Sequence, residues 1–233
     1  QEKKNSDFTL KGHVFGTTYK ITYFNTNVNY QKSLDSLFFL INKSTSTYIS
    51  TSDISKINSG DSTVIVDKIF AEVLKKAKRI YKETDGFFDP TVGNLVNAYG
   101  FGPKNEKKNL SEDEIKKQMR FVGLDKIYLK KGKVIKQDSQ VYIDFNSIAK
   151  GFAIDVVARF FDGKKIENYL IEIGGEIRAK GLKKDNKPWL IRLVDPLKSI
   201  DNDGFKTINL SNKSMATSGN YRKFRVSGEG KKY

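Results

Sequence analysis

The sequence predicts an α+β fold made of mixed, mostly antiparallel sheets with packed helices. Long amphipathic helical patterns are embedded among short strand patterns, and the strands lie at hairpin spacing. A doubly wound parallel sheet would instead need a helical crossover after almost every strand. No internal repeat, low-complexity tract or clear linker interrupts the 233 residues, so a single unit over residues 1–233 is expected.

Strand patterns begin near the N-terminus. Residues 8–24 alternate and carry β-branched and aromatic side chains around Gly12 and Gly16, which predicts two strands. A hairpin is predicted across Lys131-Gly132, because short apolar runs flank this turn sequence. The remaining strands are expected over residues 127–129, 134–136, 141–144, 169–173, 177–179, 189–194, 206–210 and 224–226.

Helices are expected where apolar residues recur at helical spacing. Residues 28–42 form one such pattern, and residues 148–161 form another. Asp67 is expected to cap a helix that ends at Asp85-Gly86, and residues 111–114 read as a capping box. Between the helix over residues 28–42 and the helix that Asp67 caps, the polar residues 45–61 predict a loop with a short helix capped by Asp53.

Composition excludes several kinds of chemistry. The chain has Cys 0 and His 1, so disulfides, thiolate catalysis, iron–sulfur clusters, cysteine-based zinc sites and His-rich metal sites are all excluded. Any metal must be a hard ion with oxygen ligands, such as Mg²⁺. The formal net charge of +15 favours polyanionic partners, but the basic residues lie among acids as on solvated surfaces. Because no basic stretch is interleaved with stacking aromatics, no nucleic-acid partner is expected.

Two features of the sequence concern the location of the protein. No apolar run reaches the about 18 residues of a membrane-spanning helix. The sequence starts at Gln1 and continues Glu2-Lys3-Lys4, which is typical of the mature form of an exported protein. We therefore expect an exported protein.

Two short segments near the N-terminus contain ligand-binding residue types. Glycines in residues 12–19 allow the backbone to approach a ligand, although a bulge in a strand explains them equally well. Tyr48 lies in the polar stretch 46–50, where its ring can stack on a planar ligand. The alternative for Tyr48 is a ring packed over the end of a helix.

Two longer segments are more specific. Residues 84–102 contain two turn glycines and the run Phe87-Phe88-Asp89, in which Asp89 precedes Pro90. This combination predicts a loop whose amides and carboxylate face a heterocycle. Asp89 is alternatively only a helix cap. In residues 142–155 a strand ends at Asp144 and a loop of small residues leads into a helix, so free amides and Lys150 converge where a phosphate can bind. The alternatives are a capping role for Asp144 and a solvated Lys150.

These four segments, in this order and followed by residues 171–177 and 215–222, resemble the ApbE family of FAD:protein FMN transferases. The resemblance implies an ApbE-like, T-fold-related fold that binds FAD with Mg²⁺ and transfers FMN to a Thr or Ser of an acceptor protein, releasing AMP. Ser147 matches a position that supplies a metal ligand in the family. Turns at residues 174–176 and 217–218 match further pocket walls. The positions that match flavin-binding residues are Phe15, where the family often has methionine, and Tyr48, Phe87, Phe88, Asp89, Asp144 and Lys150.

The resemblance also implies partners and a location. The expected acceptor is a flavoprotein subunit with an FMN-binding domain, of the redox-pump or extracellular electron-transfer type. The expected location is the periplasm or the outer side of a membrane, with a lipid anchor as one option. Two alternatives remain open: an FAD pyrophosphatase that releases FMN and AMP, and a non-catalytic cationic protein that binds flavin or an anionic surface.

The family's catalytic histidine lies in a stretch like Ser-His-Ile-Ile-Asp-Pro, just after a sequence like Gly-Lys-Lys-Tyr. Here the sequence ends at Tyr233, and His13 does not match the catalytic position. The resemblance therefore implies a C-terminally truncated form that contains no catalytic residue and is itself inactive.

Overall fold

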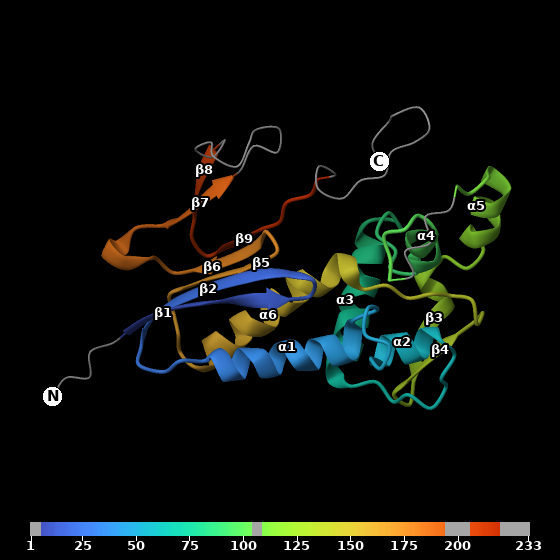
Figure 1. Ribbon diagram of the computed structural model, residues 1–233, viewed down its shortest axis with the longest axis horizontal. Coiled ribbons are helices and arrows are strands. Elements are labelled where there is room, and N and C mark those ends of the chain that lie inside the picture. The colour runs from blue at the N-terminus through green and yellow to red at the C-terminus, as the bar shows by residue number, and fades with distance from the viewer. Residues whose placement is uncertain (1–5, 104–108, 194–205, 220–233) are drawn as a thin grey trace. The chain divides into compact units, whose positions relative to one another are not determined.

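The computed structural model describes residues 6–103, 109–193 and 206–219 of the chain (Figure 1). The chain divides into two compact units, one formed by Gln1–Gln31 with Ile154–Tyr233 and the other by Lys32–Ala153. The positions of the parts relative to one another are not determined, so each unit is described by itself. The single unit predicted over residues 1–233 stays a prediction.

The first unit contains a five-stranded antiparallel sheet in the order β1-β2-β5-β6-β9. Its strands are β1 (Ser6–Val14), β2 (Thr17–Thr26), β5 (Tyr169–Ile173), β6 (Glu176–Lys180) and β9 (Lys213–Met215). The turn between β1 and β2 has positive φ at both Phe15 and Gly16, 51° and 71°, as a tight hairpin turn requires. The predicted early strands are thus confirmed. β9 was not predicted, because Lys-Ser-Met has no apolar alternation.

Helix α6 (Asn146–Gly163) begins in the second unit and enters the first unit at Ile154. In the first unit, the Phe161 ring lies 4.9 Å from the Tyr23 ring and 5.5 Å from the Tyr169 ring. These contacts pack the helix against the sheet, and all three rings are fully buried. The helix predicted over residues 148–161 is confirmed, and it begins two residues earlier.

A second sheet in this unit pairs β7 (Trp189–Leu193) with β8 (Lys206–Leu210). Apolar side chains of this ribbon and of β6 form a separate small core, and Phe24 stacks on Trp189 with ring centroids 5.3 Å apart. Both strands begin at the predicted residues. The strand predicted over residues 224–226 lies outside the described residues.

The second unit is mostly helical. Its elements are α1 (Gln31–Thr45), which starts one residue before the unit, α2 (Asp53–Asn58), α3 (Lys68–Glu83), α4 (Gly93–Ala98), α5 (Glu112–Met119), β3 (Ile127–Lys130) and β4 (Lys133–Lys136). Asp67 caps α3 as predicted, since its carboxylate accepts from the Phe70 amide at 2.9 Å. The capping box at Ser111 and the hairpin turn at Lys131-Gly132 are also confirmed.

Three local predictions need correction. Helix α1 begins at Gln31 rather than residue 28, because the Asn29 side chain accepts from the Gln31 amide at 2.8 Å and forms a turn there. The cap of α2 is Ser52 and not Asp53: the Ser52 hydroxyl accepts from the Ser55 amide at 3.1 Å. Asp53 is instead the first residue of the helix.

The strand predicted over residues 141–144 is wrong. Tyr142 makes one isolated parallel bridge with Val92, and no strand forms. The alternation of buried Val141 and Ile143 resembles a strand, but the backbone groups of Ile143 pair with a side chain. Asn58 donates to the Ile143 carbonyl and accepts from its amide, both at 2.8 Å.

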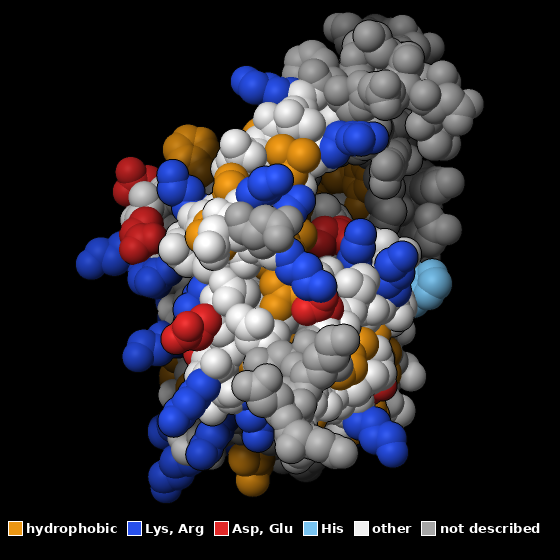
Figure 2. Space-filling view, turned by 90° about the vertical axis from the view of Figure 1, so that its left-hand side faces the viewer, with side chains coloured by type: hydrophobic (Ala, Val, Ile, Leu, Met, Phe, Trp, Pro, Cys, Tyr) orange, Lys and Arg blue, Asp and Glu red, His pale blue; other side chains and the backbone are white. Residues whose placement is uncertain are grey.

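On the face shown in Figure 2, Lys and Arg side chains are numerous and Asp and Glu side chains are few. Among the described residues, no helix combines the length and the apolar composition needed to cross a membrane.

Candidate functional site

Three of the four segments singled out in the sequence meet in the second unit. The Tyr48 hydroxyl donates to the Phe101 carbonyl at 3.1 Å, which joins the second segment to the third. The Asp144 amide donates to the Pro90 carbonyl at 2.7 Å, which joins the third segment to the fourth. The three segments, which lie up to about half of the chain apart in sequence, are therefore held together.

The second and fourth segments are also joined directly. The Asn146 side-chain amide donates to the Thr47 hydroxyl at 3.2 Å. Partial burial of the Tyr48 hydroxyl raises its pKa, and the negative charges of Asp144 and Tyr142 raise that pKa further. The Asp144 carboxylate therefore lies close enough to the Tyr48 phenol to affect its pKa.

Tyr48 presents its ring to solvent from an anchored loop. Its side chain is 58% exposed, so more than half of its surface is accessible to a ligand. Ser52, which is buried, donates to the Ser46 carbonyl at 2.6 Å while capping α2. The Ser55 hydroxyl donates to the same carbonyl at 3.3 Å. An exposed aromatic ring on a fixed loop is suited to stacking on a planar ligand.

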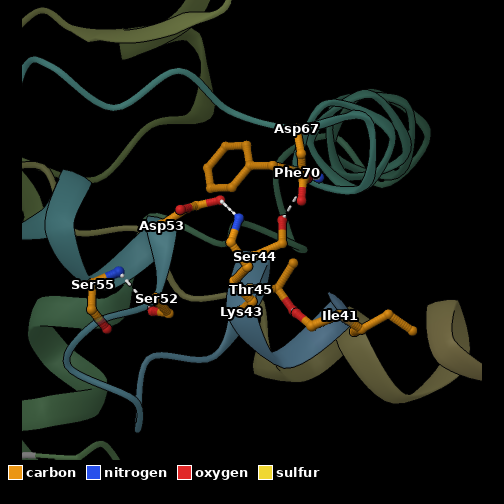
Figure 3. A network of polar contacts seen from close by, with 9 residues as sticks. All are labelled: Ile41, Lys43, Ser44, Thr45, Ser52, Asp53, Ser55, Asp67 and Phe70. Carbon is orange, nitrogen blue, oxygen red and sulfur yellow. Dashed lines mark hydrogen bonds and ion pairs between the residues drawn. The ribbon is translucent and has the colours of Figure 1, made fainter. Parts of the chain in front are cut away.

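A polar network fixes the end of α1, from which this loop departs (Figure 3). The Ser44 hydroxyl donates to the Asp67 carboxylate at 2.9 Å, so the cap of α3 also holds α1. The Lys43 ammonium lies 3.6 Å from the Asp53 carboxylate, which connects α1 to α2. Three helix ends are therefore tied together next to the Tyr48 loop.

Asp144 is a buried carboxylate at the start of α6. Its side chain is 7% exposed and accepts from the Asn146 amide at 2.7 Å. Burial raises the pKa of Asp144, and the hydrogen bonds from Asn146 offset part of that rise. No described Lys or Arg forms an ion pair with this carboxylate. The alternative that Asp144 acts as a cap is correct in that it binds a backbone amide at the helix start, but this leaves a costly buried charge unexplained.

The run Phe87-Phe88-Asp89 forms a turn before α4. The Asp89 carboxylate accepts from the Thr91 amide at 2.8 Å and from the Thr91 hydroxyl at 2.6 Å. The cap of α4 is Val92, without a side-chain bond, so the helix-cap alternative for Asp89 is wrong. The Phe88 ring is half-buried, whereas the Phe87 ring is 96% exposed. Phe87 is thus available for a ligand or partner to cover.

Ser147 and Lys150 lie three residues apart on the first turns of α6, and therefore on one face of the helix. Ser147 is exposed and Lys150 is half-exposed. The described residues contain no cluster of three or more His, Asp or Glu side chains arranged to hold a metal ion. One neutral hydroxyl does not hold Mg²⁺, which prefers octahedral oxygen coordination with carboxylates. The described donor set therefore does not by itself fit the metal.

The other recognised segments gather in the first unit, at one end of the five-stranded sheet. Phe15 lies in the turn between β1 and β2, and the Gly174 amide donates to the Thr18 carbonyl at 3.0 Å. A Cβ atom on Gly174 would lie 2.7 Å from the Thr17 side chain, and a Cβ on Gly175 would lie 3.5 Å from the Thr217 hydroxyl. These turns are therefore adjacent, as expected for parts of one wall.

The sequence did not single out Tyr142 or Asn146 as contributors to this site. Tyr142 packs so closely on Gly93 that a Cβ there would lie 2.4 Å from its ring. Gly93 is thus required by close approach at the start of α4. An aromatic residue two positions before Asp144 and an amide two positions after it were the available signals, but neither specifies a partner.

Comparison with known proteins decides the family. The sequence model of the ApbE family matches residues 15–233. The chain belongs to the ApbE family. A relative in Haemophilus influenzae, named FAD:protein FMN transferase, is 36% identical over 95% of this chain and 68% of its own length. A relative of the same name in Vibrio cholerae is 34% identical over 96% of this chain and 69% of its own length.

Solved structures of ApbE proteins share the fold. The flavin transferase ApbE from Vibrio cholerae superposes with a TM-score of 0.82 at 34% identity, covering 96% of this chain and 74% of that chain. The apo form of the Pseudomonas stutzeri flavinyl transferase ApbE gives a TM-score of 0.85 at 26% identity, covering 100% of this chain and 74% of that chain. The predicted ApbE-like α+β fold is thereby confirmed.

Proposed function

We propose that the protein is an FAD:protein FMN transferase that moves FMN from FAD to a Thr or Ser hydroxyl of an acceptor protein and releases AMP. The observation that carries the proposal is its 36% identity over 95% of the chain to the Haemophilus influenzae protein of that name. Membership of the ApbE family over residues 15–233 supports the same reaction class.

The reaction is a phosphoryl-group substitution. The acceptor hydroxyl oxygen attacks the phosphorus of the FMN half of FAD, and a phosphoester bond forms. The bond from that phosphorus to the bridging oxygen breaks, and AMP leaves with the electron pair. A general base must take the hydroxyl proton, which typically contributes about 10² to 10⁴ in rate. None of the described residues is assigned as this base.

The described residues of the second unit have roles in binding. The exposed ring of Tyr48 stacks on the isoalloxazine, for which about 1 to 3 kcal/mol is typical of aromatic stacking on a base. Lys150, on the first turns of α6, supplies a positive charge for a phosphate, while the Asn146, Ile148 and Ala149 amides are bound within the protein. Asp144 accepts hydrogen bonds from the substrate beside that helix start. Four further residues are predicted to contact the flavin: Phe15, Phe87, Phe88 and Asp89.

Dependence on Mg²⁺ is part of the proposal, and Ser147 is its proposed ligand among the described residues. When bound, the metal would neutralise charge on the pyrophosphate. We further propose an exported protein whose acceptor is a flavoprotein subunit with an FMN-binding domain, of the redox-pump or extracellular electron-transfer type. A lipid anchor to the membrane is proposed as one means of attachment.

The test is to incubate the purified full-length protein with FAD, Mg²⁺ and an FMN-binding acceptor domain, then to measure flavin fluorescence of the acceptor in a denaturing gel and AMP in solution. The expected result is covalently bound flavin and AMP in equal amounts, both lost when EDTA is added or when the target hydroxyl is removed. Free FMN and AMP without labelled acceptor would identify an FAD pyrophosphatase instead. Absence of both products, with no FAD binding, would overturn the proposal.

A further inference from the structure

Asn146 makes two bonds that lead to opposite sides of the candidate site. Its backbone amide donates to the Asp144 carboxylate at 2.7 Å, and its side-chain amide donates to the Thr47 hydroxyl at 3.2 Å. We propose that Asn146 is a positioning residue, whose side chain holds the Tyr48 loop in register with Asp144 so that one FAD molecule contacts both. The proposal rests on the proposed function, because it assumes that Tyr48 and Asp144 bind FAD.

The link is protected from water at its acceptor end. Thr47 is 5% exposed and Asn146 is half-buried, so water does not readily replace the bond. Within the described residues, it is the one hydrogen bond that joins residues 46–50 to residues 142–155. The other bonds of the Tyr48 loop lead elsewhere, such as the Tyr48 hydroxyl to the Phe101 carbonyl. Loss of this bond therefore frees the loop from the start of α6 specifically.

The charge of Asp144 acts on the Tyr48 side of the site. The negative charge of Asp144 contributes to the raised pKa of the Tyr48 hydroxyl, so the distance between them is short enough for electrostatic coupling. Thr47 precedes Tyr48 and Asn146 follows Asp144 by two residues, so their bond sets this distance. A ligand that spans both groups gains from such preorganisation, because the second contact becomes intramolecular.

A second asparagine offers a matched control. The Asn94 side-chain amide donates to the Gln140 carbonyl at 2.8 Å, an exposed bond that ties α4 to the chain before the fourth segment. Asn94→Ala removes the same kind of bond, a side-chain amide to an oxygen of another segment. It does not touch the Tyr48 loop or Asp144. Any general effect of losing such a tie will appear in both variants.

The experiment measures FAD affinity and flavin fluorescence of the full protein, well below its melting temperature. Asn146→Ala and Thr47→Val are each expected to raise the Kd for FAD about 3- to 10-fold, as loss of one hydrogen bond predicts. The fluorescence of bound flavin should also rise, since a loosely held Tyr48 quenches it less. Riboflavin, which lacks the nucleotide, should bind equally to all variants. Thr47→Ser, which keeps the acceptor oxygen, should restore wild-type values, and Asn94→Ala should retain them.

A double-mutant cycle assigns the effect to the bond itself. If Asn146→Ala and Thr47→Val act through one contact, the double variant will be no weaker than either single variant. Additive effects, or unchanged FAD affinity and quenching in both variants, would overturn the inference. Failure of the wild-type protein to bind FAD would instead overturn the proposed function. If Asn146→Ala does not fold, Thr47→Val tests the same bond, because it preserves the shape of the side chain.

Discussion

Asp144 is a residue whose buried carboxylate is unfavourable for stability when it is ionised. Its carboxylate is buried, has no ion pair with a described Lys or Arg and accepts one backbone amide. Burial raises its pKa above the ordinary value of 3.8, so the folded state holds the proton more tightly than the unfolded state. The stability contributed by that proton is fully present below the unfolded pKa and is lost as pH rises through the folded pKa.

Asp144→Asn should therefore be at least as stable as the wild-type protein at neutral pH, because the neutral amide removes the buried charge and retains an oxygen for the Asn146 amide. The difference in unfolding free energy should shrink as pH falls toward 3.8. FAD affinity at pH 7 should fall in the same variant. Thermal melting across this pH range, together with FAD titration, tests both statements. A clear destabilisation at pH 7 would indicate that the ionised carboxylate supports the fold.

Tyr48 combines an exposed ring with a hydroxyl bound to the Phe101 carbonyl, and two variants separate these parts. Tyr48→Ala should weaken FAD binding by about 1 to 3 kcal/mol, the usual range for aromatic stacking. Tyr48→Phe should retain most of the affinity, since the ring remains and only one exposed hydrogen bond is lost. Equal losses in the two variants would mean that the hydroxyl, rather than the ring, binds the ligand.

At the scale of elements, the short helix α2 shows which polar side chain starts a helix. Ser52 is 1% exposed, accepts from the Ser55 amide and donates to the Ser46 carbonyl. Asp53 is about equally favourable as a cap by residue type but lies inside the helix, where it contacts the half-exposed Lys43. The local geometry at Ser52 therefore determines the boundary, and it also anchors the loop that carries Tyr48.

Ser52→Ala should lower the unfolding free energy by about 1 to 2 kcal/mol, because it removes a cap and leaves the Ser46 carbonyl without one of its donors. Asp53→Ala should cost less, at most about 1 kcal/mol, since pairs of this partly exposed kind contribute little. Urea denaturation of the two variants provides the comparison. A larger loss in Asp53→Ala would restore Asp53 as the capping residue.

For the whole molecule, the net charge of +15 acts in opposite directions on stability and on ligand binding. Like charges repel one another in the folded state, and the same positive potential attracts an anionic ligand. On the face in Figure 2, Lys and Arg side chains clearly outnumber Asp and Glu side chains. The electrostatic effect should therefore be general and sensitive to screening.

Raising NaCl from about 0.01 M to 0.15 M shortens the Debye length from about 30 Å to 8 Å. The melting temperature should rise as repulsion is screened, while the Kd for FAD should increase. Riboflavin, which carries no phosphate, serves as the control, and its Kd should stay nearly constant. Calorimetry and fluorescence titration at both salt concentrations measure these trends. An equal increase in the Kd for riboflavin would mean that salt acts on the protein rather than on the attraction of the phosphates.

Local features of the sequence determined most of the secondary structure. The caps at Asp67 and Ser111 and the hairpin turn at Lys131-Gly132 are confirmed, because each depends on residues within a few positions of one another. The order of six segments was enough to indicate the ApbE family. The types of residue at Tyr48 and Asp144 also predicted ligand binding, which stays a prediction.

The tertiary structure alone decided which of these residues lie together. Residues 141–144 have a strand-like pattern but pair with the Asn58 side chain, and periodicity does not show whether a partner strand exists. The bond between Thr47 and Asn146 joins residues 99 positions apart, a separation at which no local pattern specifies a contact. Helix caps and hairpin turns are determined by residues within a few positions of one another. The site instead depends on side-chain hydrogen bonds that form only when distant segments pack.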